Sequence, residues 1–299
     1  MKYPKISVII PNFNYGNYLE EAILSVLNQS YPAIELIIID GGSTDNSIEI
    51  IKKYESSVNY WVSEKDSGQA DAINKGLKVC TGDYVCFLNS DDAFIGKTLE
   101  SIFSTIHSSS VDFLFGEVYI GENTQSKKML KGNKEQMLLR NLLLFFYNVR
   151  FIIPSQSVFI NRHFLEKNNI KWVDPNLHYC MDMEWYCRIS LHSPTYQKYH
   201  GVYSFFRVHP KTKTKSKSDH MRYEAIKIAL KYLPHLNSLD QKRFHRYLFY
   251  SKVLRLIYKN KILFNHQLIS GLLGKTGVFP VFDKRFWGLY KVFMLKSFK

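Results

Sequence analysis

The residues of this chain best suited to chemistry are two adjacent carboxylates, Asp91 and Asp92, which follow a short apolar run. The run, 84–88, comes shortly after Gly82 and is rich in residues that favour strands, so it predicts a buried strand. Two carboxylates at the end of such a strand are costly unless a cation or solvent compensates them. Their oxygens would suit Mg²⁺ or Mn²⁺, and a solvated turn that caps the next helix is the alternative.

The elements that must position this turn alternate along the first part of the chain. We expect strands at 6–10, 35–39, 58–62 and 84–88, and helices at 17–29, 46–54 and 69–79. This alternation is typical of a doubly wound, mostly parallel α/β sheet of Rossmann type. The loops after its strands carry Asn and Asp side chains, which can bind a base, a ribose or a cation at one edge. Neither a dinucleotide fingerprint nor a P-loop is present, which disfavours both of those protein classes.

The pattern beyond Asp92 is less regular. We expect helices at 98–107, 134–146 and 162–168, strands at 111–115 and 155–160, a hairpin at 117–130, a helix beginning at Asp182 and a β-rich segment at 199–208. Repeats are not apparent in the sequence.

Composition and charge limit the class of protein. The 299 residues are 45% hydrophobic and 22% charged, which is typical of a folded globular chain. The four cysteines form no Cys-x-x-Cys pair, so we expect reduced thiols rather than a zinc site or disulfides. We also expect neither a signal peptide nor a transmembrane helix. Of the net charge of +14, residues 211–299 contribute 20 basic and 4 acidic side chains, so the basicity belongs to the C-terminal end.

Five blocks of the sequence occur in an order and at a spacing that are specific only when they are taken together. They are S-V-I-I-P-N-F-N at 7–14, D-G-G-S-T-D-N-S at 40–47, S-E-K-D-S-G-Q-A-D-A-I-N-K-G at 63–76, G-D-Y-V-C-F-L-N-S-D-D at 82–92 and M-D-M-E-W-Y-C-R at 181–188. The chain thereby resembles the inverting, nucleotide-sugar-dependent glycosyltransferases of family 2 over about residues 3–210. This resemblance implies a GT-A fold with a doubly wound, mostly parallel sheet.

The resemblance implies a nucleotide-sugar pocket at the ends of the first two strands. Asp40 would accept the imino hydrogen of uracil through a charge-assisted bond. Its alternative role is to cap the next helix, which Ser43 could do instead. Lys75 lies one turn after Asp71 and either approaches the phosphates or belongs to a solvated helix face. The residues expected in the pocket are Pro11, Asn12, Phe13, Asp40, Ser43, Asp71, Asn89 and Ser90.

The same resemblance implies Mn²⁺ or Mg²⁺ as the cofactor. Asp91 matches the last acid of the family's D-x-D motif, and we expect Asp92 to structure the turn. His209 lies where related enzymes often supply a second metal ligand, and a plain surface histidine is the alternative. The first position of the motif is Asn89, a departure that removes a charge and weakens the expected affinity for a cation.

Asp182 matches the aspartate of the family's Glu-Asp pair, in which Met181 here replaces the Glu. The resemblance implies that it is the base that deprotonates the acceptor hydroxyl as the hydroxyl attacks the anomeric carbon. Burial in an apolar stretch would raise its proton affinity, and a plain helix N-cap is the alternative. Glu184 is the second candidate base, and Trp185 is a candidate platform for an acceptor sugar.

The C-terminal segment is basic, rich in aromatic residues and helical in pattern from His220 onward. Such a composition suits an anionic membrane surface, and packing on the catalytic domain with a solvated basic face is the alternative. Nucleic acid is not an expected partner, because no binding motif accompanies the charge. Arg207 and the lysines between 211 and 217 would either neutralise the donor's diphosphate or form a solvated linker.

We therefore expect a GT-A catalytic domain at 1–215 and a basic, aromatic-rich helical tail at 216–299. Within the first, the nucleotide-sugar half would span about 1–115 and the acceptor half about 116–215. The expected function is transfer of a sugar, with inversion, from a UDP-sugar to a glycan or lipid-linked acceptor at the cytoplasmic face of the membrane. A non-catalytic nucleotide-sugar-binding protein and a nucleotidyltransferase are the alternatives, and the absence of a Gly-rich basic segment after the first strand disfavours the latter.

Overall fold

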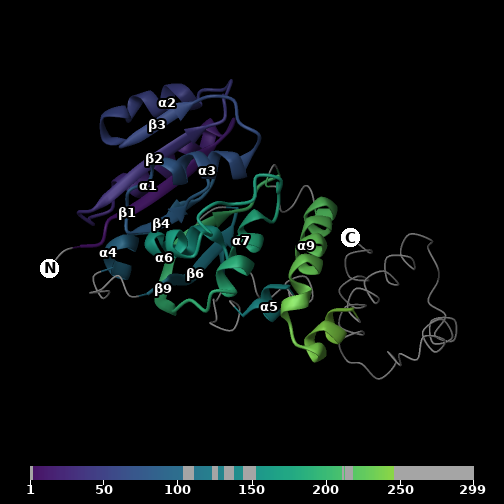
Figure 1. Cartoon of the computed structure of the whole chain (residues 1–299). Helices are drawn as coiled ribbons and strands as arrows, with labels where there is room; N and C mark the ends of the chain where they lie inside the picture. Colours follow the sequence, from purple (N-terminus) through teal and green to yellow (C-terminus); the bar gives the residue numbers. More distant parts are fainter. Residues whose placement is uncertain are drawn as a thin grey trace. The chain divides into compact units, whose positions relative to one another are not determined.

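The computed structural model describes residues 3–103, 111–122, 127–130, 138–143, 153–210, 212 and 218–245 (Figure 1). The chain divides into two compact units, of which the first ends at Tyr232 and the second begins at Leu233. The sequence placed this boundary at 215–216, ahead of the last helix of the first unit. Most of the predicted tail, from 246 onward, lies outside the described residues.

The first half of the sheet is parallel, as the alternating pattern predicts. Its strands lie in the order β3-β2-β1-β4, and every neighbouring pair is parallel. The strands are β1 (Ile6–Asn12), β2 (Ile34–Asp40), β3 (Tyr60–Ser63) and β4 (Tyr84–Phe87), and the helices between them are α1 (Gly16–Leu27), α2 (Ser47–Lys53) and α3 (Gln69–Val79). Parallel neighbours end at the same edge, so the loops after β1, β2 and β4 are brought together there.

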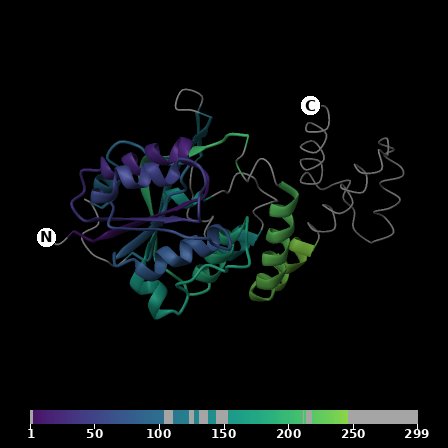
Figure 2. The ribbon, with the colours of Figure 1, turned by 90° about the horizontal axis from the view of Figure 1, so that it is seen from above.

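Helices cover both faces of this parallel half, which explains why its strands are almost continuously apolar. Figure 2 shows purple helices on one side of the sheet and a blue helix on the other. Val8 and Ile10 belong to the buried cluster that includes the apolar side of α1, whereas Ile9 points to the opposite face. A Cβ added to Gly76 of α3 would lie 2.5 Å from Ile9, so the glycine allows this helix to pack closely on β1.

The second half of the sheet is mixed. The antiparallel strand β8 (Val158–Asn161) joins β4 to β6 (Phe113–Gly121), and β9 (Tyr196–Arg207) runs parallel to β6. Two short strands complete the sheet. Strand β5 (Ala93–Phe94) pairs with β9, and strand β7 (Lys127–Leu130) pairs with β6 as the predicted hairpin. The predicted α/β sheet of GT-A type is confirmed, with its all-parallel part confined to the N-terminal half.

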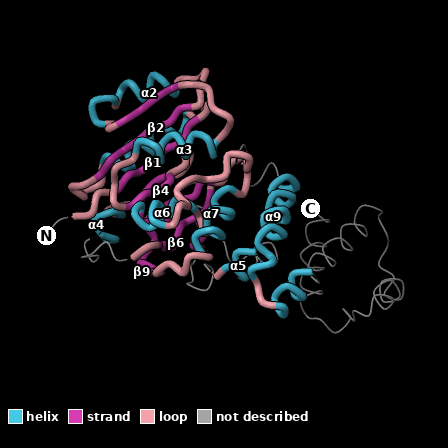
Figure 3. The backbone as a smooth tube through the Cα atoms, viewed as in Figure 1, coloured by secondary structure: helices cyan, strands magenta, loops and turns pink. Residues whose placement is uncertain are grey.

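The remaining helices of the first unit follow β5 in the chain (Figure 3). They are α4 (Thr98–Phe103), α5 (Leu139–Leu143), α6 (Arg162–Lys167), α7 (Met181–Ser190) and α9 (Ser218–Tyr232). Short 3₁₀ turns occur at Glu55–Ser57 and Ser155–Ser157 in this unit and at Leu233–His235 in the second unit. Among the described residues, no helix combines the length and the apolar character that crossing a bilayer requires. Helix α7 packs on the sheet through Trp185, whose ring stacks on Phe87 with centroids 5.2 Å apart.

Candidate active site

The loops after β1 and β2 are joined by the carboxylate of Asp40. This residue ends β2, is fully buried, and faces Asn12 across the β1–β2 register. Its Oδ1 accepts hydrogen bonds from Asn12 Nδ2 at 2.7 Å and Ser43 Oγ at 2.5 Å. Its Oδ2 accepts from Ser63 Oγ at 2.7 Å and from the backbone N–H groups of Gly42 and Ser43. Five donors therefore hold one carboxylate at the carboxyl edge of the sheet.

These donors decide the ionisation of Asp40. Burial opposes its charged form, but the hydrogen bonds from Ser43, Ser63 and Asn12 outweigh burial and lower its pKa. The Oδ1 of Asn12 is buried and has no hydrogen-bond partner among the described residues. The alternative role as a helix cap is not adopted, since Asp45 rather than Asp40 or Ser43 accepts from the N–H of Ser47 at the start of α2.

The other residues predicted for the nucleotide pocket lie around the same edge. Pro11 is buried, and Phe13 exposes 55% of its surface. Asp71, in the first turn of α3, accepts from the N–H of Ser67 at 3.0 Å. Lys75 pairs with Glu64 at 2.8 Å, so its ammonium is already partly neutralised.

The turn after β4 presents its polar side chains in different directions. Asn89 accepts at 2.7 Å from Gln69 and donates at 2.9 Å to Asp92. Asp92 is buried and also accepts from the backbone N–H of Arg207 at 2.9 Å, so it fixes the turn as predicted. Ser90 is buried as well, at 5% exposure. Asp91 is the member of the turn whose carboxylate lies beside His209, just after β9.

The structure brings Asp91 and His209 together. The His209 Nε2 lies 3.0 Å from Asp91 Oδ2, although the two residues are 118 positions apart. Burial raises the pKa of Asp91, and the contact with His209 offsets only part of that effect. The imidazole stacks on Tyr18 with centroids 4.9 Å apart and meets the edge of Tyr15 at 5.7 Å. Both tyrosines come from the start of α1, so that helix fixes the orientation of the imidazole.

Arg207 secures this arrangement rather than serving as a mobile counter-ion. Its Nε donates to the backbone oxygen of Asp91 at 3.0 Å, and its Nη2 pairs with Glu21 at 2.6 Å. Its guanidinium also lies over the ring of Tyr18. Of the two alternatives, Arg207 therefore does not belong to a solvated linker, and its role toward the diphosphate stays a prediction. The neighbouring lysines at 211, 213, 215 and 217 lie outside the described residues.

Asp91 and His209 fit a divalent cation. Their side chains lie side by side, with Nε2 of His209 3.0 Å from Oδ2 of Asp91, and an imidazole nitrogen with a carboxylate oxygen is a donor set that divalent cations accept. Within the described residues, no group of three or more His, Cys, Asp or Glu side chains is arranged to hold a metal. Mg²⁺ and Mn²⁺ often take few protein ligands and complete their shell with water and phosphate oxygens, so a pair of ligands suits either ion.

Asp182 lies in the first turn of α7 and is half-buried. Its Oδ1 accepts from the backbone N–H of Met183 at 2.8 Å, and its own backbone N–H also favours the charged form. Burial outweighs these bonds and, with a smaller contribution from the charge of Glu224, raises its pKa to about 6. A partly exposed carboxylate with a pKa near neutrality has the properties of a general base.

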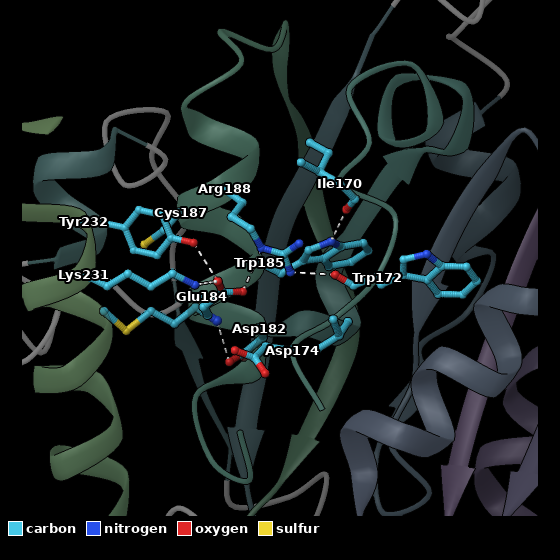
Figure 4. A network of polar contacts seen from close by, with 12 residues as sticks. Ile170, Trp172, Asp174, Asp182, Glu184, Trp185, Cys187, Arg188, Lys231 and Tyr232 are labelled. Atoms are coloured by element: carbon cyan, nitrogen blue, oxygen red, sulfur yellow. Dashed lines mark hydrogen bonds and ion pairs between the residues drawn. The ribbon is translucent and has the colours of Figure 1, made fainter. Parts of the chain in front are cut away.

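Two residues close to Asp182 have roles different from those predicted. Glu184 is buried and is held by Arg188 at 2.9 Å, Lys231 at 2.8 Å and Tyr232 at 2.6 Å, so it is not available as a second base (Figure 4). Trp185 is 1% exposed and donates to the backbone oxygen of Ile170. A buried ring cannot receive a sugar, so the prediction that Trp185 is an acceptor platform is wrong.

The sequence reasoning missed three contributors to this region. Tyr15 and Tyr18 hold His209, and their position directly after the first predicted strand was a usable signal, because helices that follow such strands begin at the binding edge. Glu224 of α9 accepts three backbone hydrogen bonds just ahead of Asp182. Nothing in the local pattern around Glu224 indicated this contact.

Comparison with known proteins connects this geometry to a family. The model of the family described as glycosyl transferase family 2 matches residues 7–186. An uncharacterized glycosyltransferase of Nostoc sp. is 30% identical over 211 residues, which are 66% of this chain and 66% of that protein. The Staphylococcus aureus poly(ribitol-phosphate) beta-N-acetylglucosaminyltransferase TarP is 34% identical over 176 residues, which are 56% of this chain and 52% of TarP. The chain thus spans about two thirds or less of the length of these relatives.

Solved structures share the fold at lower identity. S. aureus TarS 1–349, in complex with UDP-GlcNAc, superposes with a TM-score of 0.62 at 20% identity, covering 80% of this chain and 70% of that one. The mannosyltransferase PcManGT from Pyrobaculum calidifontis, in complex with GDP-Man and Mn²⁺, gives a TM-score of 0.56 at 15% identity and covers 99% and 86%. At these identities the likeness shows the fold alone.

Proposed function

This chain belongs to glycosyl transferase family 2, and we propose that it is a metal-dependent inverting glycosyltransferase. The donor would be a nucleoside diphosphate sugar, with UDP preferred, and the acceptor a hydroxyl of a glycan or a lipid-linked sugar in polysaccharide or glycolipid synthesis. Relatives named as cell-wall transferases and a neighbour that binds UDP-GlcNAc support this class of donor and product.

The proposal rests on two separate groups, which are the pair formed by Asp91 and His209 at the edge of the sheet and the carboxylate of Asp182 on α7. Asp91 and His209 lie together where β4 ends, at a separation that suits a cation. Asp182 comes from α7, is partly exposed, and has a pKa raised to about 6 by burial. A displacement with inversion needs the leaving phosphate and the base on opposite faces of the sugar, and Asp182 is separate from the pair formed by Asp91 and His209.

In this mechanism Asp182 accepts the proton of the acceptor hydroxyl while that oxygen attacks the anomeric carbon. The bond from the sugar to the diphosphate breaks in the same step, so no covalent enzyme intermediate forms. A divalent cation held by Asp91 and His209 would neutralise the charge that develops on the departing diphosphate. Asp40, Asn12 and Ser43, with Pro11, Phe13, Asp71, Asn89 and Ser90, would line the nucleotide side of the pocket.

The proposal is tested by the release of nucleoside diphosphate from a panel of nucleotide-sugars, with Mn²⁺, with Mg²⁺ and with EDTA. We expect release from a UDP-sugar that EDTA abolishes and that falls at least a hundredfold in Asp91→Asn. The same full-length chain with Glu49→Gln, an exposed carboxylate on α2, is the matched control and should keep its activity. Binding of a nucleotide-sugar without release or transfer would instead support a non-catalytic binding protein.

We also propose that the protein acts at a membrane surface, and this proposal rests on the sequence of its C-terminal segment. The 20 basic side chains of residues 211–299 would attract an anionic surface, where each one adds about 1 kcal/mol. We expect the full chain to sediment with vesicles that contain anionic lipid and to remain in the supernatant with neutral vesicles. Equal sedimentation with both would contradict the electrostatic part of this proposal.

A further inference from the structure

One carboxylate of helix α9, that of Glu224, holds the segment that precedes α7. The backbone N–H groups of three consecutive residues, His178, Tyr179 and Cys180, all donate to Glu224, at 2.9, 2.8 and 3.0 Å. Cys180 is the N-cap residue of α7 and makes no side-chain capping bond of its own. Glu224 therefore fixes, from another helix, the backbone of the three residues that lead into α7, up to and including its N-cap residue.

Further contacts between the same two segments show that this junction is extensive. The Cys180 Sγ donates to the backbone oxygen of Met221, and the ring of Tyr179 lies 5.9 Å from that of His220. These contacts complement the three hydrogen bonds to Glu224. The residues immediately before Asp182 thus have their conformation set by α9.

The contact is reciprocal, because a carboxylate of α7 also accepts hydrogen bonds from side chains of α9. Glu184 of α7 accepts from Lys231 and Tyr232 at the C-terminal end of α9, at 2.8 and 2.6 Å (Figure 4). Cations and donors near the end of a helix also complement its dipole. Two buried or half-buried carboxylates, one from each helix, thus fasten α7 to α9 on either side of Asp182 in the sequence.

We propose that Glu224 is a positioning residue for Asp182, and that α9 is therefore part of the catalytic machinery. This inference rests on the proposed role of Asp182 as the base. Helix α9 lies beyond residue 186, where the match to the family model ends, so the proposal adds an element that the family match does not include. A displaced base should lose rate rather than donor affinity, because the residues proposed to bind the nucleotide come from the loops after β1, β2 and β4 and not from α7.

The test compares Glu224→Gln and Glu224→Ala with the wild type in the full-length chain. We expect kcat for transfer to fall about tenfold in Glu224→Gln and further in Glu224→Ala, because the amide keeps one acceptor oxygen and the alanine keeps none. The KM for the donor should stay within twofold of wild type. Glu20→Gln is the matched control, since that partly exposed glutamate of α1 accepts from Lys53 and Tyr54 and is remote in sequence from α7 and α9.

A second measurement separates this inference from the proposed function. Hydrogen exchange of the amides at 178–180 should rise in both Glu224 variants and remain unchanged in Glu20→Gln, and this readout does not require turnover. A wild type without transfer activity would overturn the proposed function, whatever the exchange result. Unchanged exchange would overturn the contact, and faster exchange with wild-type kcat would overturn the positioning role.

Discussion

Asp40 and Asp182 are the same chemical group in opposite environments. Asp40 accepts five hydrogen bonds at the end of β2, and these lower its pKa despite complete burial. Asp182 has only nearby backbone N–H groups as hydrogen-bond donors among the described residues, and burial raises its pKa to about 6. The difference separates a carboxylate that is held permanently as an anion from one that can exchange a proton near neutral pH.

The largest effect that this comparison predicts is the loss of catalysis in Asp182→Asn. Removal of a general base costs about 10²- to 10⁴-fold in rate, so we expect kcat to fall about a thousandfold while the Kd of the donor is unchanged. In the wild type, kcat/KM should decline as the pH falls through about 6, because protonated Asp182 cannot accept the acceptor's proton. A pH profile that is flat from pH 5 to 8 would contradict this assignment.

The same substitution should stabilise the protein. A carboxyl whose pKa rises on folding costs stability above that pKa, and the cost disappears as the pH falls toward its unfolded value of about 4. Asp182→Asn should therefore melt a few degrees higher than wild type at pH 8, and the difference should vanish near pH 4. Thermal melting at the two pH values measures both parts of the prediction.

Asp40→Ala should have an intermediate effect, which lowers both the stability of the fold and the affinity for the donor. The substitution leaves several buried donors without an acceptor, each costing about 1–3 kcal/mol, so we expect the free energy of unfolding to fall by about 3 kcal/mol. Urea denaturation measures this loss, and binding of the donor should weaken in parallel. If Asp40→Ala were as stable as wild type, the five hydrogen bonds would not be what compensates for the burial of this carboxylate.

The smallest effect is expected for Ser63→Ala, which removes one of the five donors to Asp40. A single hydrogen bond to a charged group contributes about 1.5–3 kcal/mol at most, and the other four donors should compensate for part of it. We expect a loss of about 1 kcal/mol in urea denaturation and little change in kcat. A loss as large as that of Asp40→Ala would show that the donors act as one cooperative unit.

The parallel half of the fold could be predicted from the sequence because its signals are local. The helix Gln69–Val79 was placed at its observed bounds, since a left-handed Gly68 precedes it and its apolar residues recur with helical spacing. The two-residue strand β5 was missed because two residues carry no periodicity. The mixed order of the second half depends on pairings between distant strands, which the local pattern does not specify.

The candidate site was predictable in its residues and less so in their contacts. Asp91 and His209 were both singled out, and the structure places them 3.0 Å apart. The burial of Trp185 and the engagement of Arg207 were not foreseen, because an aromatic ring or a guanidinium suits a pocket and a core equally well by type. Glu224 was missed because its partners are backbone amides 44 to 46 residues away.

The pairing of Asp91 with His209 has a consequence for how the protein acquires its function. Asp91 follows the last strand of the parallel half, which uses mainly short-range connections, whereas His209 arrives only with the end of β9. Contacts that close long loops form late, because their entropy cost precedes their reward. A chain emerging from the ribosome would therefore bring Asp91 and His209 together only after β9 has been synthesised, so the proposed cation site would be among the last features to form.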